Sequence, residues 1–275
     1  MLKKLLKYDL KSLFKYWWIV AATSIALSTI GGFCITILTS KRDFPSVVTT
    51  SSGLLLFIAI LGIGVFSIFT MITVFIRFYK NLFTDEGYLT FTLPAKRSQI
   101  LNSKLISGLT VTAITSIMIC IDIFVMLTIP FGNAIFSKET FKVISDILSI
   151  ITEQLGAYFY IYILEFILIY VAFSLLSILF LYACITLASI ITKKARVITS
   201  IGIYYGVTSI FTLIMQIFLI FGVTSIVAKV ENLAPGCING VIALILLCLF
   251  LFTVMLCAVV YSIQYYMIDR KLNLV

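Results

Sequence analysis

Two acidic side chains, Asp122 and Glu165, stand inside long apolar stretches of this chain. Ionisable groups at membrane depth are costly and are therefore functional candidates. Each lies seven residues from one end of its stretch, or roughly 10 Å at about 1.5 Å per residue. They could face one outward vestibule and attract a cationic substrate. Alternatively, each is protonated or hydrogen-bonded to Ser, Thr or Tyr neighbours.

Few other residues suggest chemistry. The chain has no histidine, so it lacks the commonest metal ligand and the usual proton shuttle near neutral pH. It carries no phosphate-binding P-loop and no hydrolase, metalloprotease or paired-carboxylate motif. The six cysteines show no CxxC pairing and read as small buried hydrophobes rather than disulfide or metal ligands. We expect no enzyme, no catalytic residue, no metal and no cofactor on this chain.

The composition is that of a multispan membrane protein. Of its 275 residues, 62% are hydrophobic and 11% are charged, whereas a soluble domain has about 25% charged residues. We predict an all-α integral membrane protein, with residues 1–275 forming a single transmembrane domain. Six transmembrane helices are expected near residues 17–39, 53–76, 105–129, 158–190, 197–227 and 239–263.

The N-terminal residues 2–16 predict an interfacial helix. Apolar residues recur at three- and four-residue steps, and Lys3, Lys7, Lys11 and Lys15 repeat every fourth residue on the other side. Such a helix lies on a membrane with its lysines toward anionic headgroups. The alternative is the positive flank of the first span.

Basic residues are distributed unequally between the two sides of the predicted spans. One side collects fifteen of them and the other side five, namely Lys41, Arg42, Lys138, Lys142 and Lys229. The excess marks the cytoplasmic side, so both termini are expected in the cytoplasm. It also explains the net charge of +9 without nucleic acid.

Residues 77–104 form the largest basic insert between spans and are expected in the cytoplasm. We predict a short helix beginning near Arg77 with aromatic residues on one face, followed by a turn at residues 84–87. The predicted docking residues are Phe78, Tyr79, Leu82, Phe83, Asp85, Glu86 and Tyr88. A rigid amphipathic helix between two spans is suited to binding a partner; the alternative is a solvated loop.

Two further patterns complete the prediction. Closely spaced glycines allow two helices to approach each other, either within one subunit or in a dimer interface. The glycines with such spacing are Gly62, Gly64, Gly202 and Gly206. In the loop 130–157, Phe141, Ile144, Ile147, Leu148 and Ile151 have helical spacing. This pattern predicts a short amphipathic helix that caps the outer mouth or rests on the membrane.

The chain resembles ABC transporter permeases of the type-2 export class found in Gram-positive bacteria. The resembling residues are MLKKLLKYDLKS at the N-terminus and FYKNLFTDEGYLTFTLPAKRSQILNSKLIS at 78–107. The second stretch is similar to the cytoplasmic segment that such permeases carry between their second and third spans. One departure is Ala95-Lys96, where a small hydroxyl residue often precedes the basic one.

The resemblance implies an N-terminal elbow helix, a coupling helix near 78–86 and a role as an ATP-driven export permease in the bacterial cell membrane. Its partners would be an ABC ATP-binding subunit, which holds ATP and Mg²⁺, a second permease copy or paralogue, and membrane lipid. Asp85 and Glu86 would pair with basic residues of the ATPase. Substrates in this family are often antimicrobial peptides, drugs or lipid-linked molecules, and resistance is a usual task. The alternatives are a membrane-embedded lipid-modifying enzyme and an accessory or sensory subunit.

Overall fold

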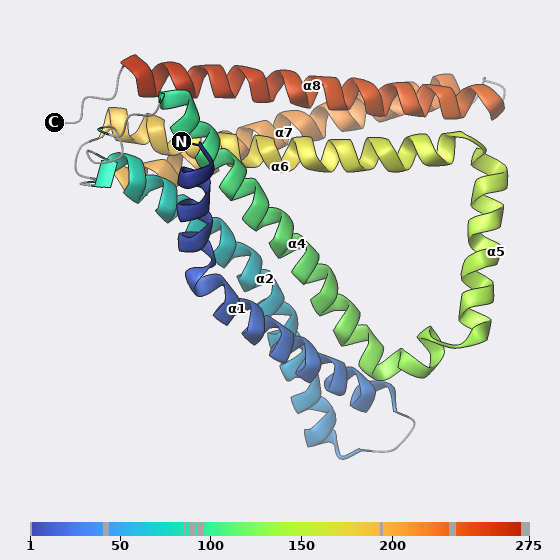
Figure 1. Cartoon of the computed structure of the whole chain (residues 1–275). Helices are drawn as coiled ribbons and strands as arrows, with labels where there is room; N and C mark the ends of the chain where they lie inside the picture. Colours follow the sequence, from blue (N-terminus) through green and yellow to red (C-terminus); the bar gives the residue numbers. More distant parts are fainter. Residues whose placement is uncertain are drawn as a thin grey trace. The chain divides into compact units, whose positions relative to one another are not determined.

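The structure, a computed structural model, describes residues 2–40, 44–84, 86–87, 92, 96–192, 195–230 and 235–270. The side chains of Met215, Phe218, Leu219, 221–230, 235–237 and Arg270 are not included in the description. The described part is all-helical and contains no strand. Its helices are α1 (Leu2–Thr39), α2 (Ser46–Phe83), α4 (Arg97–Ile135), α5 (Lys138–Leu155), α6 (Tyr158–Ile191), α7 (Arg196–Val230) and α8 (Pro235–Arg270) (Figure 1).

Six of these helices are long and apolar enough to cross a membrane, namely all except α5. In hydrocarbon a helix satisfies its own backbone hydrogen bonds, which is why apolar runs of this length form helices there. The six long apolar helices predicted from the sequence are therefore confirmed, and their length and composition indicate a multi-pass membrane protein.

The helices extend beyond the apolar runs that predicted them. Residues 2–16 and the first span form one continuous helix, α1, and Figure 1 shows its first, dark-blue stretch bending away from the remainder. The helix expected to begin near Arg77 is the unbroken end of α2, which runs to Phe83. Backbone hydrogen bonds continue along a helix after the apolar pattern stops, so hydropathy underestimates its length. The interfacial elbow and the coupling helix stay predictions.

The amphipathic helix predicted in the loop 130–157 is confirmed as α5. Ser137 caps its start, because the Thr140 backbone N–H donates to Ser137 Oγ at 3.1 Å. Gly156 ends it with φ +56°, the left-handed conformation that glycine adopts at helix ends. None of the α5 residues is buried.

The chain forms two compact units. Unit 1 contains residues 1–78 and 102–148, and unit 2 contains residues 79–101 and 149–275. Both α2 and α4 therefore begin in one unit and end in the other. Residues 79–101, the centre of the predicted coupling segment, belong to unit 2.

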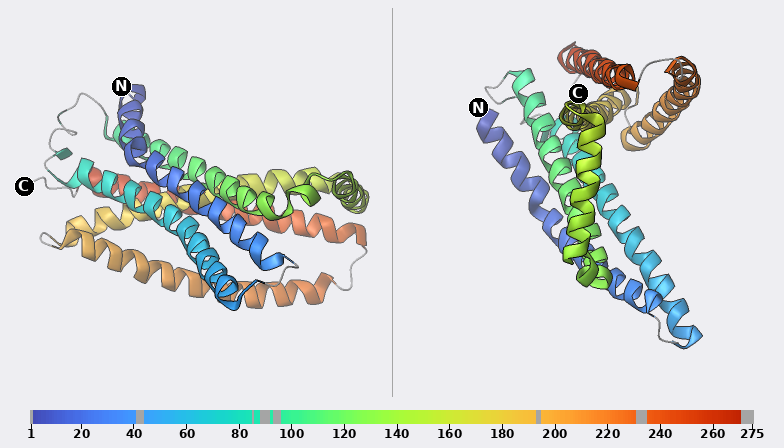
Figure 2. Two further views of the ribbon diagram at one scale, coloured as in Figure 1. Left: turned by 90° about the horizontal axis from the view of Figure 1, so that it is seen from below. Right: turned by 90° about the vertical axis from the view of Figure 1, so that its right-hand side faces the viewer.

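In unit 1, α1 and α4 run in the same direction and α2 runs opposite to them. Trp17 of α1 contacts both neighbours: its Nε1–H donates to Thr115 Oγ1 at 2.8 Å, and its ring lies 5.6 Å from the Phe66 ring. Figures 1 and 2 show the three helices side by side. In unit 2, α6 packs against both α7 and α8.

Candidate functional site

The end of α2 buries three of the seven predicted docking residues inside the protein. Phe78, Leu82 and Phe83 are buried, with 1%, 1% and 7% of their surfaces exposed. Tyr79 is half-buried and stacks on Phe83 with ring centroids 6.3 Å apart. The buried aromatic residues thus hold the helix end in place.

Other residues of the segment are open to solvent or lie outside the description. Lys80 and Glu86 are exposed. Asp85 and Tyr88, also predicted to dock a partner, lie outside the described residues. Lys80 and Glu86 are therefore charged groups of the segment that a partner can reach, as are the exposed Lys96 and Arg97 near the start of α4.

Arg196 connects this helix end to α7. Its Nη1 donates to the carbonyl of Phe83 at 3.0 Å. Phe83 is the last residue of α2, and the final carbonyls of a helix have no partner within the helix. A cation at this position also interacts favourably with the negative end of the helix dipole. The first residue of α7 thus caps α2.

Arg97 connects the start of α4 to the end of α8. Its Nη1 donates to Asp269 Oδ1 at 3.0 Å, to the Ile268 carbonyl at 3.2 Å and to the Asp269 carbonyl. The two charged side chains are 45% and 44% exposed, and exposed ion pairs contribute only about 0–1 kcal/mol. Arg97 is therefore better suited to positioning α8 than to stabilising the fold.

In unit 1, a buried ion pair joins α1 to α4 about two turns after Arg97 along α4. Lys104 Nζ pairs with Asp9 Oδ1, and Ser103 Oγ donates to Asp9 Oδ2 at 2.6 Å. Asp9 is 3% exposed, Lys104 5% and Ser103 0%. Because buried charges need compensation, this three-residue cluster makes the relative position of the two helices specific.

Asp122 lies further along the same helix pair. It is fully buried, and the hydroxyls of Ser24 and Ser28 on α1 come within its reach. Those hydroxyls donate instead to the carbonyls of Ala21 and Ser24, each at 2.9 Å. Among the described residues, neither Asp122 oxygen has a hydrogen bond. Asp122 thus has hydroxyl residues nearby without a hydrogen bond to them, and both interpretations of this acid stay predictions.

Glu165 belongs to unit 2 and is 7% exposed. Its Oε2 has no hydrogen bond within the described part of the chain. Tyr162, one turn away, donates from its hydroxyl to the Asn239 carbonyl at 2.9 Å. The structure describes each acid within its own unit, and a vestibule shared by Asp122 and Glu165 stays a prediction.

The four glycines differ in their surroundings. A Cβ added to Gly62 would meet the Leu27 side chain, so this glycine packs against α1. A Cβ added to Gly64, Gly202 or Gly206 would meet nothing within 4 Å among the described residues. A closer contact that sequence did not indicate is at Gly32, where the added atom would lie 2.9 Å from Ile129 Cβ and 3.0 Å from the Met126 carbonyl.

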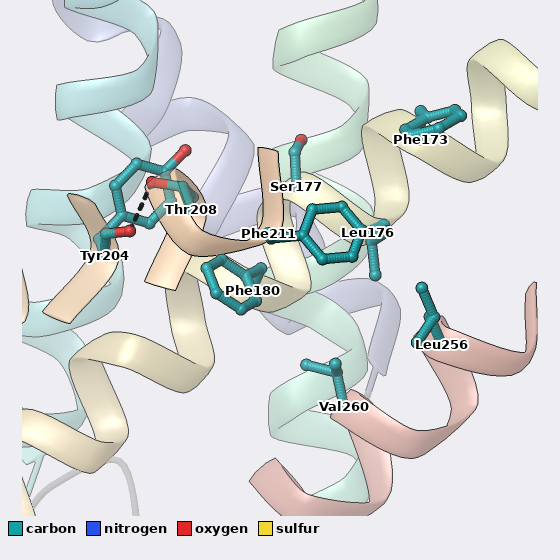
Figure 3. Close-up of a pocket in the computed structure, with 9 residues that line it drawn as sticks. All are labelled: Phe173, Leu176, Ser177, Phe180, Tyr204, Thr208, Phe211, Leu256 and Val260. Atoms are coloured by element: carbon teal, nitrogen blue, oxygen red, sulfur yellow. Dashed lines mark hydrogen bonds between the residues drawn. The ribbon is translucent and has the colours of Figure 1, made fainter. Parts of the chain in front are cut away.

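Unit 2 also contains an apolar cavity of about 270 Å³ between α6, α7 and α8. Figure 3 shows the residues that line it: Phe173, Leu176, Ser177, Phe180, Tyr204, Thr208, Phe211, Leu256 and Val260. Sequence reasoning missed it, because these helices are apolar on every side. The available signal was the recurrence of Phe173, Ser177 and Phe180, and of Tyr204, Thr208 and Phe211, at steps of three and four residues.

Comparison with known proteins identifies no relative. No family model, no curated protein and no solved structure matches this chain. The membership of this chain in the type-2 permeases therefore stays a proposal.

Proposed function

We propose that this chain is the membrane-spanning permease subunit of an ATP-driven ABC exporter. It would lie in a bacterial cell membrane with both termini in the cytoplasm and would move an amphipathic molecule outward. ATP and Mg²⁺ would be bound by a separate ATPase subunit, since this sequence has no P-loop. A second permease copy or paralogue would complete the transporter.

The observation that carries this proposal is the attachment of residues 79–101. At one end Arg196 binds the Phe83 carbonyl, and at the other Arg97 binds the last turn of α8. The same segment continues covalently into unit 1 through α2 and α4. A push on it would thus act on α7 and α8 through hydrogen bonds and on unit 1 through two continuous helices. This arrangement suits a segment that receives force from a partner.

The contact with the ATPase would use the exposed groups of the segment. Glu86 is exposed, and together with Asp85 it would face basic residues of the ATPase. Phe78, Leu82 and Phe83 would act indirectly, by keeping the end of α2 rigid. Tyr79, half-buried on Phe83, would lie at the edge of this contact.

The proposal is tested by copurification. The tagged full chain is solubilised from its native membrane, and bound proteins are identified by mass spectrometry. We expect a P-loop ATPase, and we expect its recovery to fall by about tenfold, equivalent to about 1.4 kcal/mol, when Asp85→Lys and Glu86→Lys are combined.

Glu153→Lys is the matched control, because Glu153 is an exposed acid on α5, away from the segment. It should leave recovery of the ATPase unchanged. Equal recovery from the double variant and from the unaltered chain would remove the docking assignment. Absence of any ATPase would favour the lipid-modifying enzyme. ATPase binding without ATP-driven movement of any molecule would favour the accessory subunit.

A further inference from the structure

The apolar cavity between α6, α7 and α8 has the chemistry of a hydrocarbon site. Four aromatic and three aliphatic side chains line it, and no charged residue does. Its two aliphatic hydroxyls are satisfied locally: Ser177 donates to the Ser174 carbonyl at 2.9 Å, and Thr208 donates to the Tyr204 carbonyl at 2.6 Å (Figure 3). A charged group here would lose its hydration without meeting an opposite charge.

The depth of the cavity matches the hydrocarbon region of a bilayer. Tyr204 lies eight residues into α7 from Arg196, or about 12 Å at about 1.5 Å per residue. Phe173 lies eighteen residues before the end of α6 at Ile191, or about 27 Å by the same rise. The hydrocarbon core of a bilayer is about 30 Å thick, so lipid chains are the material available at this level.

The size of the cavity favours a single lipid acyl chain over a protein partner. An engineered cavity of about 150 Å³ with aliphatic and aromatic walls stays dry and binds benzene, and this one holds about 270 Å³. A stable interface with a second subunit buries about 800 Å² per partner, far more than so small a hollow provides.

The charge at the start of α7 favours an anionic headgroup. Arg196 is the first residue of α7 and lies eight residues, or about two turns, before Tyr204. The preceding residues Lys193 and Lys194 add two positive charges in sequence. Basic residues at the ends of transmembrane helices attract anionic lipid headgroups.

We propose that the cavity binds one acyl chain of an anionic membrane phospholipid, whose phosphate interacts with Arg196. The site goes beyond the transport function and does not depend on it, because it needs only this chain and a membrane. A lipid held here would contact α6, α7 and α8 at once.

The test is photolabelling of the full chain reconstituted in vesicles. The probe is phosphatidylglycerol with a diazirine in the middle of one acyl chain, and the labelled residues are mapped by mass spectrometry. We expect labelling at the cavity residues to exceed that at exposed residues of α2, such as Ile68, by at least several-fold. Ile68 is 59% exposed and serves as the internal reference for bulk lipid.

Two variants fill the cavity, Ser177→Phe on α6 and Leu256→Trp on α8. Each should reduce labelling at the cavity at least threefold while the reference at Ile68 stays constant. Ile210→Phe is the matched control: Ile210 is 60% exposed on α7 and does not line the cavity. It should leave the labelling as it is.

The headgroup is tested separately with phosphatidylcholine carrying the same chain, and with Arg196→Gln. The cavity should prefer phosphatidylglycerol, and Arg196→Gln should abolish the preference. Labelling spread evenly over all exposed faces, or unaffected by both filling variants, would overturn the proposal that the cavity binds an acyl chain. Equal labelling by the two lipids would overturn the anionic assignment. None of these readouts involves an ATPase, so they stand or fall independently of the proposed function.

Discussion

At the residue scale, polar side-chain contacts join helices that are otherwise largely apolar. Asp9, Ser103 and Lys104 form a buried cluster, and Trp17 binds Thr115, whose hydroxyl lies 3.2 Å from that of Thr70. Lipid is as apolar as the helix surfaces, so contacts of this kind and close packing determine which helices associate. They make the α1–α4 pair specific along much of its length.

The first prediction concerns the Asp9–Lys104 pair. Asp9→Leu or Lys104→Met alone should destabilise the chain by about 3–5 kcal/mol, because each leaves one buried charge without compensation. The double variant should lose less stability than either single variant. Thermal unfolding of the full chain in detergent measures this cycle, and additive costs would show that the two charges do not interact.

The second prediction concerns Asp122. Asp122→Asn keeps the shape of the side chain, removes its charge and supplies an N–H donor to the oxygens of Ser24 and Ser28. The free energy of unfolding of the variant should lie within about 1 kcal/mol of that of the unaltered chain, or above it. A loss of more than about 3 kcal/mol would mean that the negative charge itself is needed, as a substrate path or a bound cation would require.

Sequence patterns at this scale identified the charged residues but not their partners. Asp9 and Lys104 are 95 positions apart, and a periodic pattern shows the face of one helix without showing which helix covers it. Lys104 was counted as one of fifteen cytoplasmic charges, whereas its buried position reflects a neighbour that only the folded chain supplies. The same applies to Arg97 and Arg196.

At the element scale, the apolar runs predicted the helices well and their ends poorly. The fourth and fifth spans, expected at 158–190 and 197–227, are Tyr158–Ile191 and Arg196–Val230. The third span, expected to end at residue 129, continues as α4 to Ile135 with Pro130 inside it. Proline removes only one backbone donor and kinks a helix rather than always ending it, so α4 can continue past Pro130.

The cavity shows a second limit of sequence at this scale. Amphipathic helices such as α5 reveal their buried and exposed faces, but α6, α7 and α8 are apolar all round. Their cavity-lining residues have the same types as those facing lipid, and only the folded arrangement distinguishes them.

The third prediction compares two glycines in adjacent helices. Gly32→Ala should destabilise the chain by about 1–3 kcal/mol, because its Cβ would lie 3.0 Å from the Met126 backbone carbonyl, which cannot move aside freely. Gly64→Ala should be neutral or stabilise α2 by about 0.5–1 kcal/mol, since alanine favours helix and the site is open. Thermal unfolding checks both. Similar effects at the two positions would show that α1 and α4 do not approach closely at Gly32.

At the scale of the whole molecule, the distribution of charge predicts the orientation in the membrane. Fifteen of twenty basic residues fall on one side of the six spans, and such an excess faces the cytoplasm. This prediction places the exposed helix α5 outside the cell with Lys138 and Lys142, and the N-terminal lysines of α1 inside.

The fourth prediction tests this orientation by labelling with a membrane-impermeant maleimide in a cysteine-free background. Lys142→Cys on α5 should be labelled in intact cells. Lys11→Cys on α1 should be labelled only after the membrane is permeabilised. The reverse pattern would place both termini outside and would exclude docking of a cytoplasmic ATPase to residues 77–104.

A site-specific photo-crosslinker at Glu86 tests the proposal that the segment following α2 binds an ATPase. The full chain carries p-benzoylphenylalanine at residue 86 in its native membrane, with the same substitution at Glu153 of α5 as the control, both positions being exposed. We predict a covalent adduct to a P-loop ATPase from residue 86 and none from residue 153. No ATPase adduct from residue 86, or the same adduct from both positions, would contradict the account.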